Sequence, residues 1–176
     1  MTRTHTPALG ISRVLLRILQ VLNIFVGVLL VGFFVATFLA EPFFRDLFVR
    51  DDLAPAEGGG VMTVLRLWLI LALPTVGALH ILLSRLLEML GTVKAGDPFV
   101  PENARRLKTI AWCALAVQVI LLLFGPMAAW MNAAGSQIDG AFRFDLSGWL
   151  AVALAFVLAQ VFEAGTAMRA DLDAMI

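Results

Sequence analysis

Long stretches without a single charged residue dominate this chain and restrict it to one class of fold. The first covers residues 18–40, which are 23 consecutive uncharged positions. A helix needs about 20 residues to cross a hydrocarbon core about 30 Å thick, so this stretch is long enough to span a membrane. Three further stretches follow, at 67–84, 109–138 and 146–162. Since a helix satisfies its backbone hydrogen bonds internally in lipid, the pattern predicts an all-α, integral membrane four-helix bundle.

The composition agrees with this class. Of the 176 residues, 61% are hydrophobic and only 15% are charged, and the mean hydropathy is +0.93. These values lie outside the range of soluble domains. We therefore predict a single membrane domain over residues 1–176. It divides into spans at about 18–40, 67–87, 109–131 and 146–162, an outer loop at 41–66, an elbow at 88–108 and a tail at 163–176.

Lysine and arginine are distributed unevenly between the two sides that four spans would create. The side with both termini and the elbow holds nine, and the opposite side holds four. The nine are Arg3, Arg13, Arg17, Arg85, Lys94, Arg105, Arg106, Lys108 and Arg169, and the four are Arg45, Arg50, Arg66 and Arg143. Because cytoplasmic loops carry the excess of these residues, we predict that the N-terminus, the elbow and the C-terminal tail are cytoplasmic.

The four tryptophans fit the same topology. Trp68, Trp130 and Trp149 fall at predicted span ends on the outer side, and Trp112 falls at one on the inner side. An amphipathic indole ring is favoured at the boundary between lipid and water. We therefore expect all four rings at the membrane interfaces.

The outer loop contains an aromatic pattern. Phe43, Phe44, Leu47 and Phe48 recur at helical spacing between charged residues. Such a segment can lie flat in the headgroup zone. It can equally be an ordinary loop whose aromatic side chains cap the bundle, and the sequence leaves both interpretations open.

Polar side chains within the predicted spans gather toward the inner side. The set comprises Asn23, His80, Gln118 and Gln160. One interpretation is hydrogen bonding between helices, with each bond contributing about 1 kcal/mol. The other is a small cavity open to the cytoplasm, with His80 as its titratable group.

The elbow combines helix ends with turn residues. Gly91 can end the second spanning helix, and Gly96, Asp97 and Pro98 have turn chemistry. Pro101 suits the first position of a new helix. The sequence therefore predicts an ordered connection, with Phe99 packed back at the membrane surface.

Elbow and tail also carry a pattern of specific residues. Lys94, Gly96, Asp97, Pro98 and Phe99 are followed by Glu102, Asn103, Arg106, Leu107 and Ile110, and the tail adds Val161, Phe162, Glu163, Gly165, Met168, Arg169, Asp171 and Leu172. This pattern resembles a bacterial four-helix membrane protein family known as domain of unknown function 2975. The resemblance covers most of the chain, although the ending at Ala174 and Met175 departs from the usual one.

The resemblance implies a multi-pass protein of the bacterial cell (inner) membrane and, as a partner, a small cytoplasmic helix-turn-helix regulator. The leading hypothesis is thus a non-catalytic module that binds or signals to such a partner through the elbow and tail. Its candidate binding residues are Gly96, Pro98, Phe99, Asn103, Arg106, Phe162, Gly165, Arg169 and Asp171.

A small transporter or channel subunit, working as a homo-oligomer, is the alternative, and it would use the inner polar cluster around His80. We do not expect enzymatic activity, because the chain lacks an HExxH motif, paired Asp residues in a span and the strand–turn–helix nucleophile motif of hydrolases. No cofactor or metal site is expected either. The basic residues of the elbow are too few and too mixed with acids to predict direct nucleic-acid binding.

Overall fold

The computed structural model describes residues 7–50, 60–133 and 145–173, and the described residues are almost entirely helical. The helices are α1 (Pro7–Leu39), α2 (Glu41–Arg50), α3 (Gly60–Lys94), α4 (Pro101–Ala133) and α5 (Leu146–Asp173). Four of them contain segments long and apolar enough to cross a membrane: Leu9–Leu39, Met62–Lys94, Pro101–Ala129 and Leu146–Asp171. The predicted all-α membrane fold with four spanning helices is confirmed.

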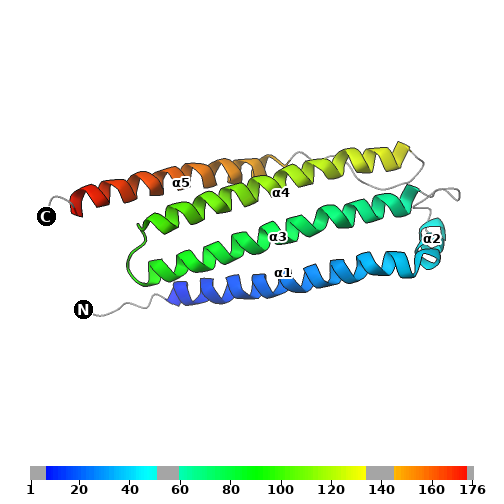
Figure 1. Cartoon of the computed structure of the whole chain (residues 1–176), viewed down its shortest axis with the longest axis horizontal. Coiled ribbons are helices and arrows are strands. Elements are labelled where there is room, and N and C mark those ends of the chain that lie inside the picture. Colours follow the sequence, from blue (N-terminus) through cyan, green and yellow to red (C-terminus); the bar gives the residue numbers. More distant parts are fainter. Residues whose placement is uncertain (1–6, 51–59, 134–144, 174–176) are drawn as a thin grey trace.

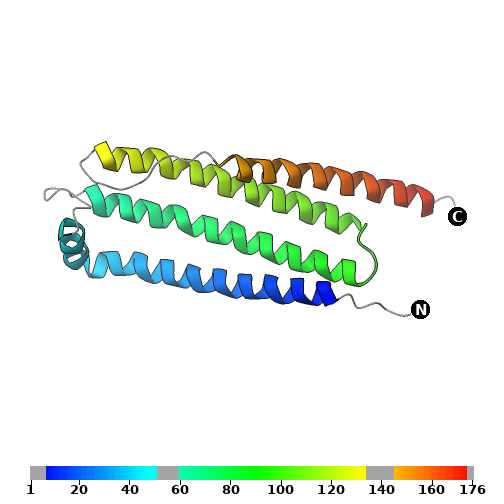
Figure 2. The ribbon, with the colours of Figure 1, turned by 180° about the vertical axis from the view of Figure 1, so that it is seen from behind.

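The four long helices lie side by side in one layer, in the order α1, α3, α4, α5 (Figures 1 and 2). Each packs against its neighbour in this row, and α1 and α5 form the two edges. The buried core is therefore a set of narrow strips between neighbours, such as the one formed by Leu107, Ile110 and Ala159. Most large apolar side chains face outward, as expected where lipid is the solvent.

The helices are longer than the spans predicted from hydropathy. With 35 residues, α3 is about 50 Å long at 1.5 Å per residue, whereas the hydrocarbon core is about 30 Å thick. Both α3 and α4 therefore continue through most of the predicted elbow, and only residues 95–100 connect them. The prediction that Pro101 begins a helix is confirmed.

The prediction that Gly91 ends a helix is wrong, because α3 continues to Lys94. The turn occurs at Gly96, whose φ of 86° is accessible to glycine at little steric cost. The Gly96 amide donates to the Val93 carbonyl at 3.1 Å, and the Asp97 amide donates to the Thr92 carbonyl at 3.1 Å. This pair of hydrogen bonds is a Schellman motif, which satisfies the last carbonyls of the helix.

Contacts along α5 fix its position relative to α4. At its start, a Cβ added to Gly148 would lie 2.0 Å from Nε2 of Gln118, so the two helices approach closely there. Since α4 continues from Gln118 to Ala133, it runs about 22 Å past the start of α5. Figure 1 shows this offset, with α5 beginning beside the middle of α4.

The offset separates two tryptophans that the predicted topology places at the same interface. Trp149 lies one residue after Gly148, beside the middle of α4, whereas Trp130 lies close to the C-terminal end of α4. The placement of the tryptophans at membrane interfaces stays a prediction. Trp68 of α3 lies against Phe124, in the C-terminal half of α4, with ring centroids 6.0 Å apart. Hydropathy gives the length of an apolar segment, but specific side-chain contacts determine its axial position.

At the opposite end from the elbow, Arg66 of α3 ties α1 to α2. Its guanidinium donates to the Glu41 carboxylate at 2.8 Å and to the Thr37 carbonyl at 2.7 Å. The hydrogen bond and positive charge of Arg66 lower the pKa of Glu41. The segment with helical aromatic spacing is indeed a helix, and Phe44 in it packs edge-on against Phe33 of α1, with ring centroids 5.4 Å apart.

Candidate functional site

Asn103 lies at the centre of the hydrogen-bond network in the elbow. Its side chain is fully buried. Its amide nitrogen donates to the Thr92 hydroxyl at 2.6 Å and to the Pro98 carbonyl at 2.9 Å. Its amide oxygen accepts a hydrogen bond from Arg106 at 2.9 Å. Asn103 therefore joins the end of α3, the turn and the start of α4, and its side-chain donors and acceptor are all used within the chain.

Arg106 continues this network toward the membrane. Its Nε donates to Glu88 of α3 at 2.9 Å, and Glu88 also accepts from Arg85 at 2.9 Å. One carboxylate thus holds two guanidinium groups from two helices. Asn103 and Arg106, both predicted to contact a partner, form hydrogen bonds that build the elbow.

The tail packs against the elbow of the same chain. The Phe99 ring stacks on the Phe162 ring, with centroids 5.3 Å apart and an interplanar angle of 29°. A Cβ added to Gly165 would lie 3.2 Å from the Phe99 ring, so the absence of a side chain lets the ring lie against α5. Arg169 forms an ion pair with Asp97.

Phe162, Gly165 and Arg169 are spaced by three and four residues, so they occupy one face of α5. That face is the one in contact with the elbow. We call the combined surface of residues 94–99 and 162–171 the elbow–tail surface. The structure brings two segments that are far apart in the sequence into this single surface.

The nine candidate binding residues differ in their availability. Asn103 is buried, the Pro98 carbonyl is occupied, and Phe162 and Gly165 are partly covered by Phe99. Gly96, Phe99, Arg169 and Asp171 retain exposed surface. The candidate binding residues did not include Asp97, whose charge is opposite to that of Arg169, or Met168, which is 62% exposed although apolar.

The polar residues predicted to cluster inside the membrane lie in separate places between the helices. Asn23 of α1 is buried and donates to the Val76 carbonyl of α3 at 3.1 Å. One turn away, Gln20 donates to the Ser84 hydroxyl at 2.9 Å. Gln118 packs against Gly148 of α5, and Gln160 is exposed on α5. Only Asn23 and His80 therefore share a site, because similar depth does not make side chains face each other.

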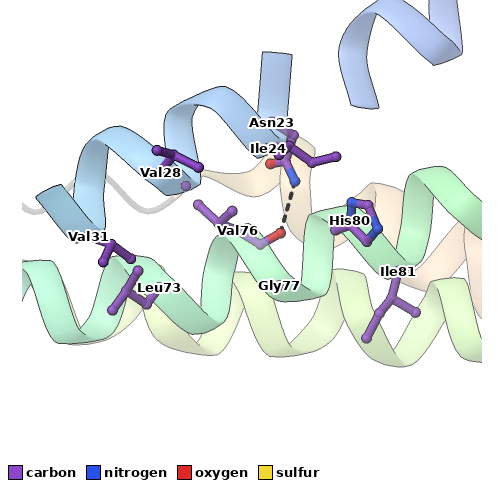
Figure 3. Close-up of a pocket in the computed structure, with 10 residues that line it drawn as sticks. Asn23, Ile24, Val28, Val31, Leu73, Val76, Gly77, His80 and Ile81 are labelled. Carbon is purple, nitrogen blue, oxygen red and sulfur yellow. Dashed lines mark hydrogen bonds between the residues drawn. The ribbon is translucent and has the colours of Figure 1, made fainter. Parts of the chain in front are cut away.

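That site is a groove of about 650 Å³ between α1 and α3 (Figure 3). Its walls are mainly apolar, and Asn23 and His80 lie toward one end. Its remaining lining residues are Ile24, Gly27, Val28, Val31, Leu73, Val76, Gly77 and Ile81. Nδ1 of His80 is buried and has no hydrogen-bond partner among the described residues. The described residues contain no group of three or more His, Cys, Asp or Glu side chains that could hold a metal ion.

Comparison with known proteins places the chain in a family. The family model described as "Protein of unknown function (DUF2975)" matches residues 19–176. No curated protein and no solved structure matches the chain. The family match runs from within α1 through the elbow to the end of the tail. Because it covers nearly the whole sequence, the chain belongs to the DUF2975 family.

Proposed function

We propose that this multi-pass membrane protein is a non-catalytic module of the bacterial inner membrane that binds a cytoplasmic protein through the elbow–tail surface. The observation that carries the proposal is the docking of the tail on the elbow through Phe99, Gly165 and Arg169. This contact gives an ordered surface beyond the apolar spans, built from two distant segments. An ordered surface lowers the entropic cost of binding a partner.

The side chains left exposed on this surface are of types enriched at protein interfaces. Phe99 remains 44% exposed and Met168 62% exposed, beside the exposed charges of Arg169 and Asp171. Aromatic residues, methionine and arginine are over-represented where proteins bind one another. The resemblance adds the identity of the partner that we propose, a small helix-turn-helix regulator.

Photo-crosslinking in living cells tests the proposal. A photo-crosslinking amino acid at Met168 should form a covalent adduct with the tagged helix-turn-helix regulator encoded beside the gene. The same amino acid at Asp46, which is exposed on α2 at the opposite end, should not. Replacing Asp171 by Arg should weaken the adduct, whereas Asp46→Arg should leave it unchanged. Equal adducts at both positions, or none at Met168, would reject the regulator as the partner.

A second candidate function is transport of a proton or small solute by a homo-oligomer. The groove beside His80 favours it, because ionisable side chains within membrane spans often mark transport pathways, and Nδ1 of His80 has no hydrogen-bond partner among the described residues. His80→Ala should then abolish a flux measured in proteoliposomes. Thr75→Ala is the matched control, since Thr75 bonds only within α3 to the Leu71 carbonyl. A flux that His80→Ala leaves unchanged would remove this candidate.

A further inference from the structure

The short helix α2 runs across the end of the layer that is opposite the elbow. Figure 1 shows it crossing from the end of α1 toward the start of α3. Two contacts hold it there: Glu41 at its start pairs with Arg66 of α3, and Phe44 packs edge-on against Phe33 of α1. Because the long helices are the membrane spans, a helix that lies across their ends follows the plane of the membrane.

The lengths of α1 and α3 give the depth of this end. On the elbow side, Arg17 and Arg85 border the uncharged stretches of the two helices. Thr37 follows Arg17 by 20 positions, and Arg66 precedes Arg85 by 19. At about 1.5 Å per residue both distances are about 30 Å, the thickness of the hydrocarbon core. The Thr37 carbonyl accepts a hydrogen bond from Arg66 at 2.7 Å, so both helices place the far boundary of the hydrocarbon at this contact.

The apolar side chains of α2 point from this boundary toward the hydrocarbon. Phe33, which Phe44 contacts, precedes Thr37 by four residues and so lies about 6 Å deeper along α1. Leu47 is three residues after Phe44 and shares its side of α2. The Phe43 ring meets the Phe44 ring edge-on, with centroids 5.6 Å apart. The three side chains therefore form one apolar face directed below the boundary.

The protein itself covers only part of this face. Phe44 is partly buried, whereas Phe43 is 66% exposed and Leu47 is 43% exposed. Asp46, also exposed, is two residues from Phe44 and hence about 200° away around the helix. A polar side away from the bilayer and an apolar side toward it are typical of helices that lie in the headgroup region.

We propose that α2 inserts Phe43 and Leu47 into the lipid leaflet opposite the elbow, while Glu41 and Phe44 hold it to the layer. Lipid is the occupant that the depth of the face favours. Two side chains also cover far less than the area of about 800 Å² per partner that a stable protein interface buries. This membrane contact is independent of the proposed function, which uses the elbow–tail surface at the other end.

Site-directed spin labelling of the full-length protein tests the proposal, in vesicles of phosphatidylethanolamine and phosphatidylglycerol. In a Cys113→Ser background, a nitroxide on Leu47→Cys should collide more with oxygen, which concentrates in lipid, than with a water-soluble nickel chelate. Its depth should be about 5–10 Å below the headgroup surface. The same label on Asp46→Cys should show the reverse preference. A Leu47→Cys label that collides mainly with the chelate would overturn the proposal, and so would one that is protected from both reagents.

Photo-crosslinking in the same vesicles identifies what covers the face. A photo-crosslinking amino acid at Phe43 should form an adduct with the mass of a phospholipid, and the same amino acid at Asp46 should not. An adduct between two protein chains at Phe43, or equal lipid adducts at both positions, would overturn the proposal. Each variant should keep the melting temperature of its parent. If Leu47→Cys lowers it, Phe43→Cys carries the spin label in its place, with the same expected result.

Discussion

Asn103 shows how a single side chain determines the shape of the elbow. Its amide group bonds to Thr92 of α3, to the turn at Pro98 and to Arg106 of α4. Because the side chain is fully buried, removing it would leave several polar groups without partners away from water. The glycines at 96 and 165 contribute in the opposite way, by the absence of a side chain at a turn and at a close contact.

Asn103→Ala should therefore destabilise the protein strongly for a single substitution. We expect a loss of about 2–3 kcal/mol, the usual result of leaving buried hydrogen-bonding groups unpaired. Equilibrium unfolding in sodium dodecyl sulfate, followed by circular dichroism, measures it. The neighbouring exposed Glu102→Ala should change stability by less than about 0.5 kcal/mol. Similar losses for the two variants would contradict the role of Asn103.

At the scale of elements, an ion pair joins two helices at the end opposite the elbow. Arg66 of α3 holds Glu41 of α2, and its guanidinium lies 4.0 Å from the Phe38 ring centroid of α1. Arg66 lowers the pKa of Glu41 in the folded state, so the ionised form is favoured by folding. The stabilisation is present above the ordinary glutamate pKa and is lost as the pH falls through the lowered value.

The melting temperature should consequently fall on acidification from neutral pH to about pH 3, in a range that includes the ordinary glutamate pKa of about 4.3. Glu41→Gln should lower the melting temperature at neutral pH and reduce this pH dependence. Asp46→Asn, which replaces an exposed carboxylate on the same helix, serves as the control. An unchanged acid-dependent shift in Glu41→Gln would show that other carboxylates cause it.

On the scale of the whole molecule, the layer order and the offset of α5 distinguish this fold from four spans aligned by hydropathy alone. The offset follows from two contacts along α5: Gln118 meets Gly148 near its start, and Phe99 meets Phe162 beyond its middle. Between them, Trp112 packs edge-on against Phe156, with ring centroids 5.5 Å apart. Three contacts along the pair agree on one register.

Disulfide cross-linking tests this register. In a Cys113→Ser background, cysteines at Gln118 and Gly148 should form a disulfide upon mild oxidation, because the two helices approach closely there. Cysteines at Trp130 and Trp149 should not, since α4 extends well past the start of α5. Efficient cross-linking of the second pair, and none of the first, would restore the register expected from hydropathy.

Orientation in the membrane is a separate prediction, drawn from the distribution of lysine and arginine. In the same background, Lys94→Cys should react with a membrane-impermeant maleimide only after the cells are permeabilised. Asp46→Cys, exposed on α2, should react in intact cells. Labelling of Lys94→Cys from outside intact cells would invert the topology and place the elbow–tail surface outside the cell.

The sequence by itself determined the class of fold and several helix limits. Uncharged stretches of spanning length predict the four long helices, since lipid leaves the backbone no other way to satisfy its hydrogen bonds. Pro101 marks the start of α4 through its fixed φ and missing amide hydrogen. These properties depend on local chemistry, which residue order alone specifies.

Only the tertiary structure decided which polar residues meet and how far each helix is shifted along its neighbour. Asn23 and His80 line one groove while Gln118 and Gln160 do not, and Trp149 lies beside the middle of α4 and not at its C-terminal end. Phe99 finds its partner 63 positions later, at Phe162. The length of an apolar segment stays the same when its helix shifts along its axis, so it does not specify the register. A few close contacts between distant residues determine the register.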